Sequence, residues 1–97
     1  MINAFHQIDE VIHQKIRLGI MSLLAAHDSA EFVELKEQLQ VTDGNLSSHI
    51  ALLEKNKYLT VHKSFAGKRP LTTLKITKKG RDALAKYFEV IKLILEE

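Results

Sequence analysis

The sequence predicts a mainly helical α+β fold, with four helices and one β-hairpin around a single core. Two features of the pattern point to this fold. Apolar residues recur at helical spacing near both ends of the chain, and two stretches of alternating apolar and polar residues surround a turn in the second half. The third observation is size, because 97 residues with 45% hydrophobic content suffice for one core but not for two. We therefore expect residues 1–97 to form one domain.

The first helix is expected at residues 9–27. Ile12, Ile16 and Ile20 recur there every four residues, which places them on one face of a helix, and no proline interrupts the stretch. Whether the helix continues unbroken past His13 stays open. A second apolar stripe on the opposite side indicates that this helix packs against more than one surface.

Two further helices are expected at residues 33–39 and 42–57, after a loop at residues 27–30. Thr42 is a favourable N-cap residue for the second of them, and Asp43 places negative charge in its first turn, where the helix dipole favours it. The core stripe of this helix consists of Leu46, Ile50 and Leu53. Its opposite face holds small and hydrogen-bonding residues.

Two strands are expected at residues 59–65 and 71–76, because apolar and polar residues alternate in both. The segment 66–70 joins them. Gly67 permits a tight turn there, and Pro70 favours an extended conformation at the residue before it. The strands therefore form a hairpin, and its tip is basic.

The last helix is expected at residues 77–96, with Thr77 as its N-cap, and it carries more apolar surface than one small core can bury. The first helix has the same excess. We therefore expect the two terminal helices to pair with those of a second copy in a two-fold dimer. The residues expected at this interface are Leu18, Met21, Tyr87, Val90, Ile91 and Ile94.

Charge is distributed unevenly, although the net charge is only +2. Residues 42–80 carry eight Lys and Arg against two Asp and Glu, whereas residues 1–41 carry three against six and residues 81–97 carry three against four. A basic segment on a mildly acidic scaffold is typical of proteins that bind a polyanion. Lys78 and Lys79 support this interpretation, because positive charge in the first turn opposes the helix dipole and does not serve helix stability.

The order of elements is that of a winged helix-turn-helix. In such a fold the helix after the tight turn enters the DNA major groove, and the hairpin, or wing, contacts the backbone or the minor groove. Double-stranded DNA is therefore the expected partner. For Asn45 and Ser47 a structural role, in satisfying free backbone donors of the first turn, stays an alternative. The residues expected to contact DNA are Thr42, Gly44, Asn45, Ser47, Ser48, Lys55, Lys63, Lys68 and Arg69.

Several separate motifs resemble those of the MarR/ArsR-type winged-helix transcriptional regulators, and especially a short stand-alone subfamily. They are Gly-Asn-Leu-Ser-x-His at 44–49, Gly-Lys-Arg-Pro-x-Thr at 67–72, Ile-Thr-x-x-Gly-Arg at 76–81 and Ile-His-x-x-x-Arg-Leu at 12–18. The resemblance covers nearly the whole chain. It implies a DNA-reading helix at 42–57, a wing on the backbone or minor groove, and dimerisation through the terminal helices. The function it implies is that of a homodimeric regulator, most simply a repressor.

Other functions have less support in the sequence. The absence of cysteine excludes disulfides and thiolate metal sites, and no phosphate-binding loop, nucleophile elbow or paired acid motif indicates an enzyme. A winged helix can also bind another protein, or sense a small ligand or a metal, for which His6, Asp9 and His13 are candidate ligands. We nevertheless expect neither a metal nor a cofactor. Without a signal peptide or an apolar run of about 20 residues, the expected location is the cytoplasm.

Overall fold

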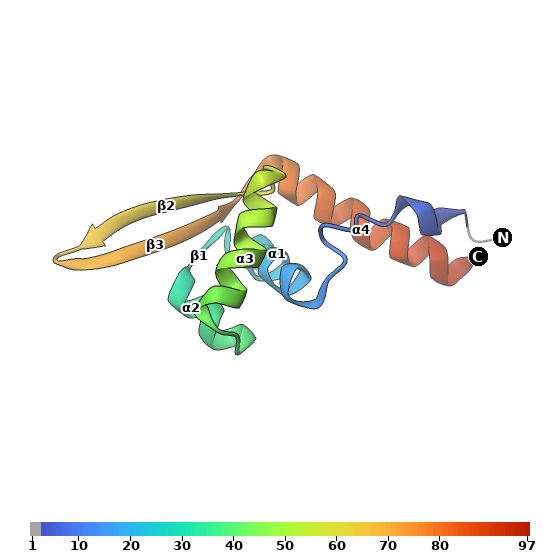
Figure 1. The fold of residues 1–97 in the computed structure, drawn as a ribbon. Coiled ribbons are helices and arrows are strands. Elements are labelled where there is room, and N and C mark those ends of the chain that lie inside the picture. Colours follow the sequence, from blue (N-terminus) through green and yellow to red (C-terminus); the bar gives the residue numbers. More distant parts are fainter. Residues whose placement is uncertain (1–2) are drawn as a thin grey trace.

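The computed structural model describes residues 3–97 as four α-helices, one short 3-10 helix and a three-stranded antiparallel sheet (Figure 1). This confirms the predicted α+β winged helix. The first two residues of the predicted domain lie outside the described part. In chain order the elements are η1 (Ala4–Gln7), α1 (Lys15–His27), β1 (Ser29–Glu31), α2 (Phe32–Leu39), α3 (Asp43–Lys55), β2 (Leu59–Ala66), β3 (Arg69–Ile76) and α4 (Lys78–Glu96).

The first helix is shorter than predicted, because it begins at Lys15 and not near residue 9. Gln14 is its N-cap, and the Gln14 side chain accepts a hydrogen bond of 2.8 Å from the backbone N–H of Arg17. Upstream, Asp9 Oδ1 accepts from the backbone N–H groups two and three residues later, at 2.9 and 3.3 Å. The break lies at Gln14, whose backbone is extended (φ −155°, ψ 136°) and whose side chain takes the Arg17 N–H that a continuous helix would bond to the carbonyl of residue 13, so the helix begins at Lys15.

A third strand forms where the sequence predicted only a loop at residues 27–30. β1 pairs antiparallel with β3, with Ser29 opposite Lys75 and Ala30 opposite Leu74, so the strand order is β1-β3-β2. Three residues are too few to show an alternating pattern, and β1 therefore left no signal in the sequence.

The wing is a long hairpin that projects from the body of the molecule (Figure 1). Its pairing runs from Leu59 opposite Ile76 to Ala66 opposite Arg69, which extends the predicted strands by one residue in β2 and two in β3. Gly67 has a φ of 67°, in the left-handed region that favours glycine in a tight turn. Leu59 is buried at the base, whereas the outer half of the hairpin is exposed.

The core lies where α1, α3, α4 and the base of the sheet meet. Leu46, Ile50 and Leu53, the predicted core stripe, are all buried. The other buried members of this cluster are Ile12, Ile20, Met21, Leu24, Leu35, Leu59, Leu74, Ile76, Leu84 and Tyr87. No helix within residues 3–97 is long and apolar enough to cross a membrane.

The start of α4 is fixed against the end of α3 by a close backbone approach. A Cβ atom on Gly80 would lie 2.1 Å from the carbonyl oxygen of Tyr58, so only glycine fits there. Thr77 caps the helix by accepting from Gly80 N at 2.9 Å, and its hydroxyl donates to the Lys57 carbonyl at 2.7 Å. These contacts hold the wing, α3 and α4 at set positions relative to one another.

The far half of α4 leaves the body on the side opposite the wing, and η1 lies beside it (Figure 1). We call η1 and the C-terminal half of α4 the terminal arm. Three of the residues predicted for a dimer interface, Met21, Tyr87 and Val90, are buried within the chain itself. A side chain enclosed by its own chain offers a second copy no surface, so these three are removed from the predicted interface.

Candidate nucleic-acid interface

Helix α3 buries one face and leaves the other uncovered. The uncovered face carries residues predicted to contact DNA, and these residues are exposed: Thr42, Gly44, Asn45, Ser47, Ser48 and Lys55. The core stripe on the opposite side of the helix packs into the protein, and this packing turns the polar face outward. An exposed polar helix of this size fits the width of a DNA major groove.

The backbone donors of the first turn of α3 do not depend on the side chains of Asn45 and Ser47. Thr42 Oγ1 accepts from the backbone N–H of Asn45 at 3.1 Å, so Thr42 is a capping residue as predicted. Among residues 3–97, the side chains of Asn45 and Ser47 form no hydrogen bond. The alternative that they satisfy backbone donors of the first turn therefore has no support, and both remain available to a ligand.

Gly44 has no packing reason to be glycine. A Cβ atom built on it would meet no other atom within 4 Å, and its φ is not in the left-handed region. A glycine in an exposed helix costs stability relative to alanine. An open site that keeps glycine allows another molecule to approach the backbone closely.

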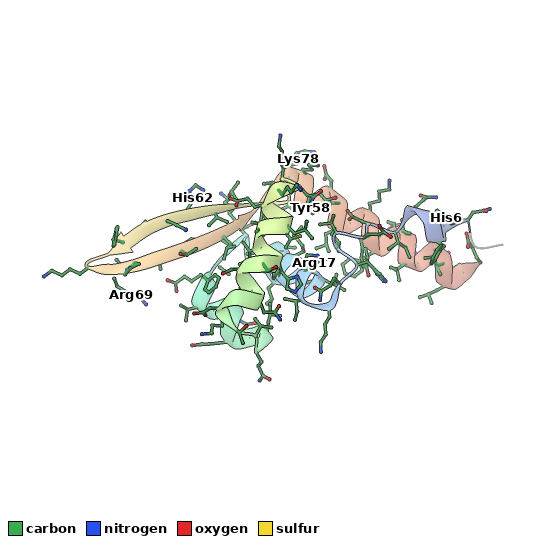
Figure 2. The ribbon with its side chains drawn as sticks, viewed as in Figure 1. His6, Arg17, Tyr58, His62, Arg69 and Lys78 are labelled. Carbon is green, nitrogen blue, oxygen red and sulfur yellow. The ribbon has the colours of Figure 1, made fainter. Side chains whose placement is uncertain are left out.

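The wing supplies positive charge at some distance from α3. Lys63 and Lys68 are exposed, and Figure 2 shows Arg69 at the far end of the hairpin. Arg69 lies 3.9 Å from Glu31, with the two side chains 68% and 38% exposed. A contact this long between solvated groups contributes little, so the charge of Arg69 remains available to a phosphate.

A groove of about 630 Å³ separates α3 from the wing. Val61, Lys63 and Leu74 line it from the sheet, and Glu54 lines it from α3. Lys63 was predicted as a DNA contact, whereas Glu54 and Thr72 were not singled out. The remaining lining residues are Phe32, Ser47, Ile50 and Ala51.

Two lysines of α4 have partners within the chain. Lys78 Nζ lies 2.9 Å from Asp82 Oδ2, and Lys79 Nζ lies 5.7 Å from the centre of the Tyr58 ring. Contrary to the expectation from the helix dipole, both lysines therefore have structural contacts, since an i,i+4 ion pair and a cation–π contact each contribute a few tenths of a kcal/mol or more.

Arg17 and His49 form a contact between α1 and α3 that no prediction included. Arg17 Nη1 lies 3.0 Å from His49 Nδ1, and the Arg17 Nε–H donates to the Val11 carbonyl at 2.5 Å. Burial lowers the pKa of His49, and the positive charge of Arg17 lowers it further. Both effects favour the neutral form of His49. Each residue appears in a motif of the sequence, but their contact depends on how α1 and α3 pack.

The candidate metal ligands do not gather at one place. His6 belongs to η1, Asp9 accepts a hydrogen bond from the Tyr58 hydroxyl, and His13 Nδ1 lies 2.8 Å from the Tyr87 hydroxyl. Within residues 3–97, no three His, Asp or Glu side chains lie close enough together to hold a metal ion. The prediction that His6, Asp9 and His13 could share one helical face fails because α1 starts after all three.

Comparison with known proteins agrees with this geometry. Residues 16–95 match the model of a family described as a winged helix DNA-binding domain. An uncharacterized protein of Methanocaldococcus jannaschii is 38% identical over 85 residues, which cover 87% of this chain and 92% of that protein.

Solved structures show the same likeness. A transcriptional regulator homologue from Pyrococcus horikoshii OT3 superposes with a TM-score of 0.89 at 30% identity, over 96% of this chain and 94% of that chain. NadR, in a complex with 4-hydroxyphenylacetate, superposes with a TM-score of 0.67 at 22% identity, over 96% of this chain and 66% of that chain. The second likeness concerns the fold alone.

Proposed function

The chain belongs to the winged helix DNA-binding domain family, and from this premise we propose that it is a homodimeric, sequence-specific regulator of transcription, most simply a repressor. The observation that carries the proposal is the uncovered face of α3, which presents small and hydrogen-bonding side chains beside a basic wing. Repression needs only that a bound protein exclude others from the same DNA, and no activating surface is required.

Recognition divides between α3 and the wing. Asn45 and Ser48, near the N-terminal end of α3, have side chains that can donate to and accept from base edges in the major groove. Gly44 lets the helix backbone come close to the groove floor. Lys68 and Arg69, at the wing tip, suit phosphates or a narrow minor groove. The α3 residues specify the DNA sequence, and the wing residues supply affinity and orientation.

The terminal arm supports a dimer. Phe88 and Leu95 are 51% and 80% exposed, and with the half-buried Ile91 they form one stripe along α4. The chain is also extended for its length, with a Cα radius of gyration of 14.7 Å against about 12.5 Å for a compact domain of this size. An arm that exposes a continuous apolar stripe gains stability when a second copy covers it. Leu18, Ile91 and Ile94, half-buried in the chain, remain in the proposed interface.

A module that binds another protein is the competing function. Such a module would need large anchor side chains on the outward face of α3, since a few buried tryptophan, tyrosine and arginine side chains carry most protein–protein affinity. That face instead carries Asn45, Ser47, Ser48 and Lys55, and its apolar neighbour Leu52 is half-buried at the margin. The DNA proposal is therefore the better supported.

Selection from a random double-stranded DNA library with the purified chain tests this function. We expect enrichment of one motif, present as two inverted half-sites about 10 base pairs apart, because a two-fold dimer places two equivalent helices one DNA turn apart. A library that shows no enrichment after repeated rounds contradicts sequence-specific recognition. Enrichment of a single unrepeated site would contradict the dimer.

A further inference from the structure

Arg17 is held more firmly than a solvent-exposed arginine. Its Nε–H donates to the Val11 carbonyl at 2.5 Å, its Nη2 donates to the Glu10 carbonyl at 3.4 Å, and its Nη1 lies 3.0 Å from His49 Nδ1. Both carbonyls belong to the segment before α1, whereas His49 belongs to α3. The guanidinium therefore joins three parts of the fold, and its position is fixed before any ligand binds.

The charge of Arg17 is not neutralised by these contacts. Two of its acceptors are backbone carbonyls and the third is a neutral imidazole nitrogen. Among residues 3–97 it forms no ion pair with a carboxylate. A half-buried guanidinium that has only neutral acceptors keeps its full positive charge and favours an anion nearby.

The same contacts determine the chemistry of His49. Because Nδ1 faces a guanidinium, which has donors only, Nδ1 must accept, and the proton of the neutral ring must be on Nε2. Among the described residues, His49 forms no second hydrogen bond. The Nε2–H group is consequently a fixed donor without a partner, on a ring that is partly exposed.

Arg17 and His49 lie on the flank of α3 that faces away from the wing. At 3.6 residues per turn, His49 is about 160° around the helix from Ser47, and Ser47 lines the groove between α3 and the wing. Figure 2 shows Arg17 on the side of α3 opposite the hairpin. A helix in the major groove lies between two phosphate backbones, so these flanks face different DNA strands.

We propose that Arg17 and His49 form a second phosphate clamp, which binds the DNA strand on the opposite edge of the major groove from the strand that the wing contacts. Arg17 provides the charge and holds His49 in the tautomer that donates from Nε2. His49 provides a directed hydrogen bond to a phosphate oxygen. This inference rests on the proposed DNA-binding function and adds a site to it, because Arg17 and His49 belong to neither α3's outward face nor the wing.

The test is a salt titration of DNA affinity for Arg17→Gln, with Lys15→Gln as the matched control. Lys15 is an exposed cation on the same helix, about 160° around it from Arg17, so both variants lose one positive charge. For Arg17→Gln we expect the slope of log affinity against log salt to fall by about one unit per bound protomer, and affinity for random and selected duplexes alike to drop about tenfold at 0.1 M salt. Lys15→Gln should leave the slope unchanged.

Variants of His49 test the clamp independently of that charge. His49→Gln keeps an N–H donor at a reach similar to Nε2, whereas His49→Phe keeps the ring shape without any donor. We expect His49→Gln to retain most of the affinity and His49→Phe to lose it on both duplexes. Ring-nitrogen NMR shifts of the wild-type chain should show the Nε2–H tautomer, with slower exchange of that proton when DNA is bound.

The outcomes separate this proposal from the function on which it rests. A wild-type chain that binds no DNA overturns both. If the wild type binds DNA but Arg17→Gln shows the same slope as Lys15→Gln, the clamp is overturned and the function stands. A loss confined to the selected duplex, with an unchanged slope, means that Arg17 only positions α3, which also overturns the clamp. If Arg17→Gln does not fold, the comparison of His49→Gln with His49→Phe decides, and equal affinities overturn the proposal.

Discussion

The hydroxyl of Tyr58 donates to Asp9 Oδ2 across 2.5 Å and so joins the segment before α1 to the junction between α3 and the wing. Asp9 uses its other carboxylate oxygen to accept from two backbone N–H groups of that segment, at 2.9 and 3.3 Å. Burial, the hydrogen bond to Asp9 and the negative charge of Asp9 together raise the pKa of Tyr58 to about 12. One carboxylate thus organises the approach to α1 and anchors it to the junction between α3 and the wing.

Tyr58→Phe should lower the free energy of unfolding by about 1.5 to 3 kcal/mol at pH 7, because it removes one partly buried hydrogen bond to a charged acceptor. The folded wild-type chain keeps the Tyr58 proton up to about pH 12, whereas the unfolded chain releases it near pH 10. The contribution of this hydroxyl is therefore lost as the pH rises from 10 towards 12. Urea unfolding of both proteins between pH 7 and 11 checks this, and a difference between them that does not shrink above pH 10 would argue against the bond.

Two glycines should respond oppositely to replacement by alanine. Gly80→Ala should destabilise the fold by several kcal/mol, since its Cβ would lie 2.1 Å from the Tyr58 carbonyl oxygen and must displace backbone. Gly44→Ala should be neutral or stabilising by up to about 1 kcal/mol, because nothing lies within 4 Å of the new atom and alanine favours a helix. Thermal unfolding measures both changes.

Gly44→Ala should nevertheless weaken DNA binding, as the added methyl group holds the helix away from the groove floor. A variant that is both as stable and as tightly bound to the selected DNA as the wild type would show that Gly44 does not face the groove.

The dimer should depend on one side of α4 only. Phe88→Asp places a charge in the proposed apolar interface and should convert the dimer into a folded monomer, because an unpaired charge in a dry interface costs several kcal/mol. Leu93→Glu is the matched control, since Leu93 is 47% exposed but lies on the other side of the helix from Phe88 and Leu95. Light scattering at micromolar concentration should give twice the 11.0 kDa chain mass for the wild type and for Leu93→Glu, and the single mass for Phe88→Asp. A wild-type protein of single mass would refute the interface.

Periodicity predicted the fold and the position of α3 because both depend on local pattern. Leu46, Ile50 and Leu53 define the buried face of α3, and the exposed face follows by geometry. The same reasoning failed for Met21 and Tyr87, because an apolar stripe tells that a side chain is buried without telling whether its own chain or a partner buries it.

Contacts between segments far apart in the sequence produce no periodic pattern from which they could be predicted. The sequence could not indicate that Arg17 contacts His49, since the two are 32 residues apart and the contact depends on the carbonyls of the turn before α1. The motif at 76–81 illustrates a related limit. Gly80 and Arg81 in that motif have structural roles, because Gly80 packs on the Tyr58 carbonyl and Arg81 bonds the carbonyl of Ala25 and the carboxylate of Asp28. A motif typical of a functional family can therefore contain residues that maintain the fold and do not bind a ligand.

The most direct test of the central claim is a salt titration of affinity on selected and random duplexes for the wild type, Arg69→Ala and Asn45→Ala. The wild-type affinity should fall linearly on logarithmic axes as salt rises, and Arg69→Ala should lower that slope by about one unit per protomer on both duplexes while preserving the preference between them. Asn45→Ala should cost about 1 to 3 kcal/mol on the selected duplex and much less on random DNA. Equal losses on both duplexes for Asn45→Ala, together with an unchanged slope for Arg69→Ala, would contradict the division of recognition between α3 and the wing.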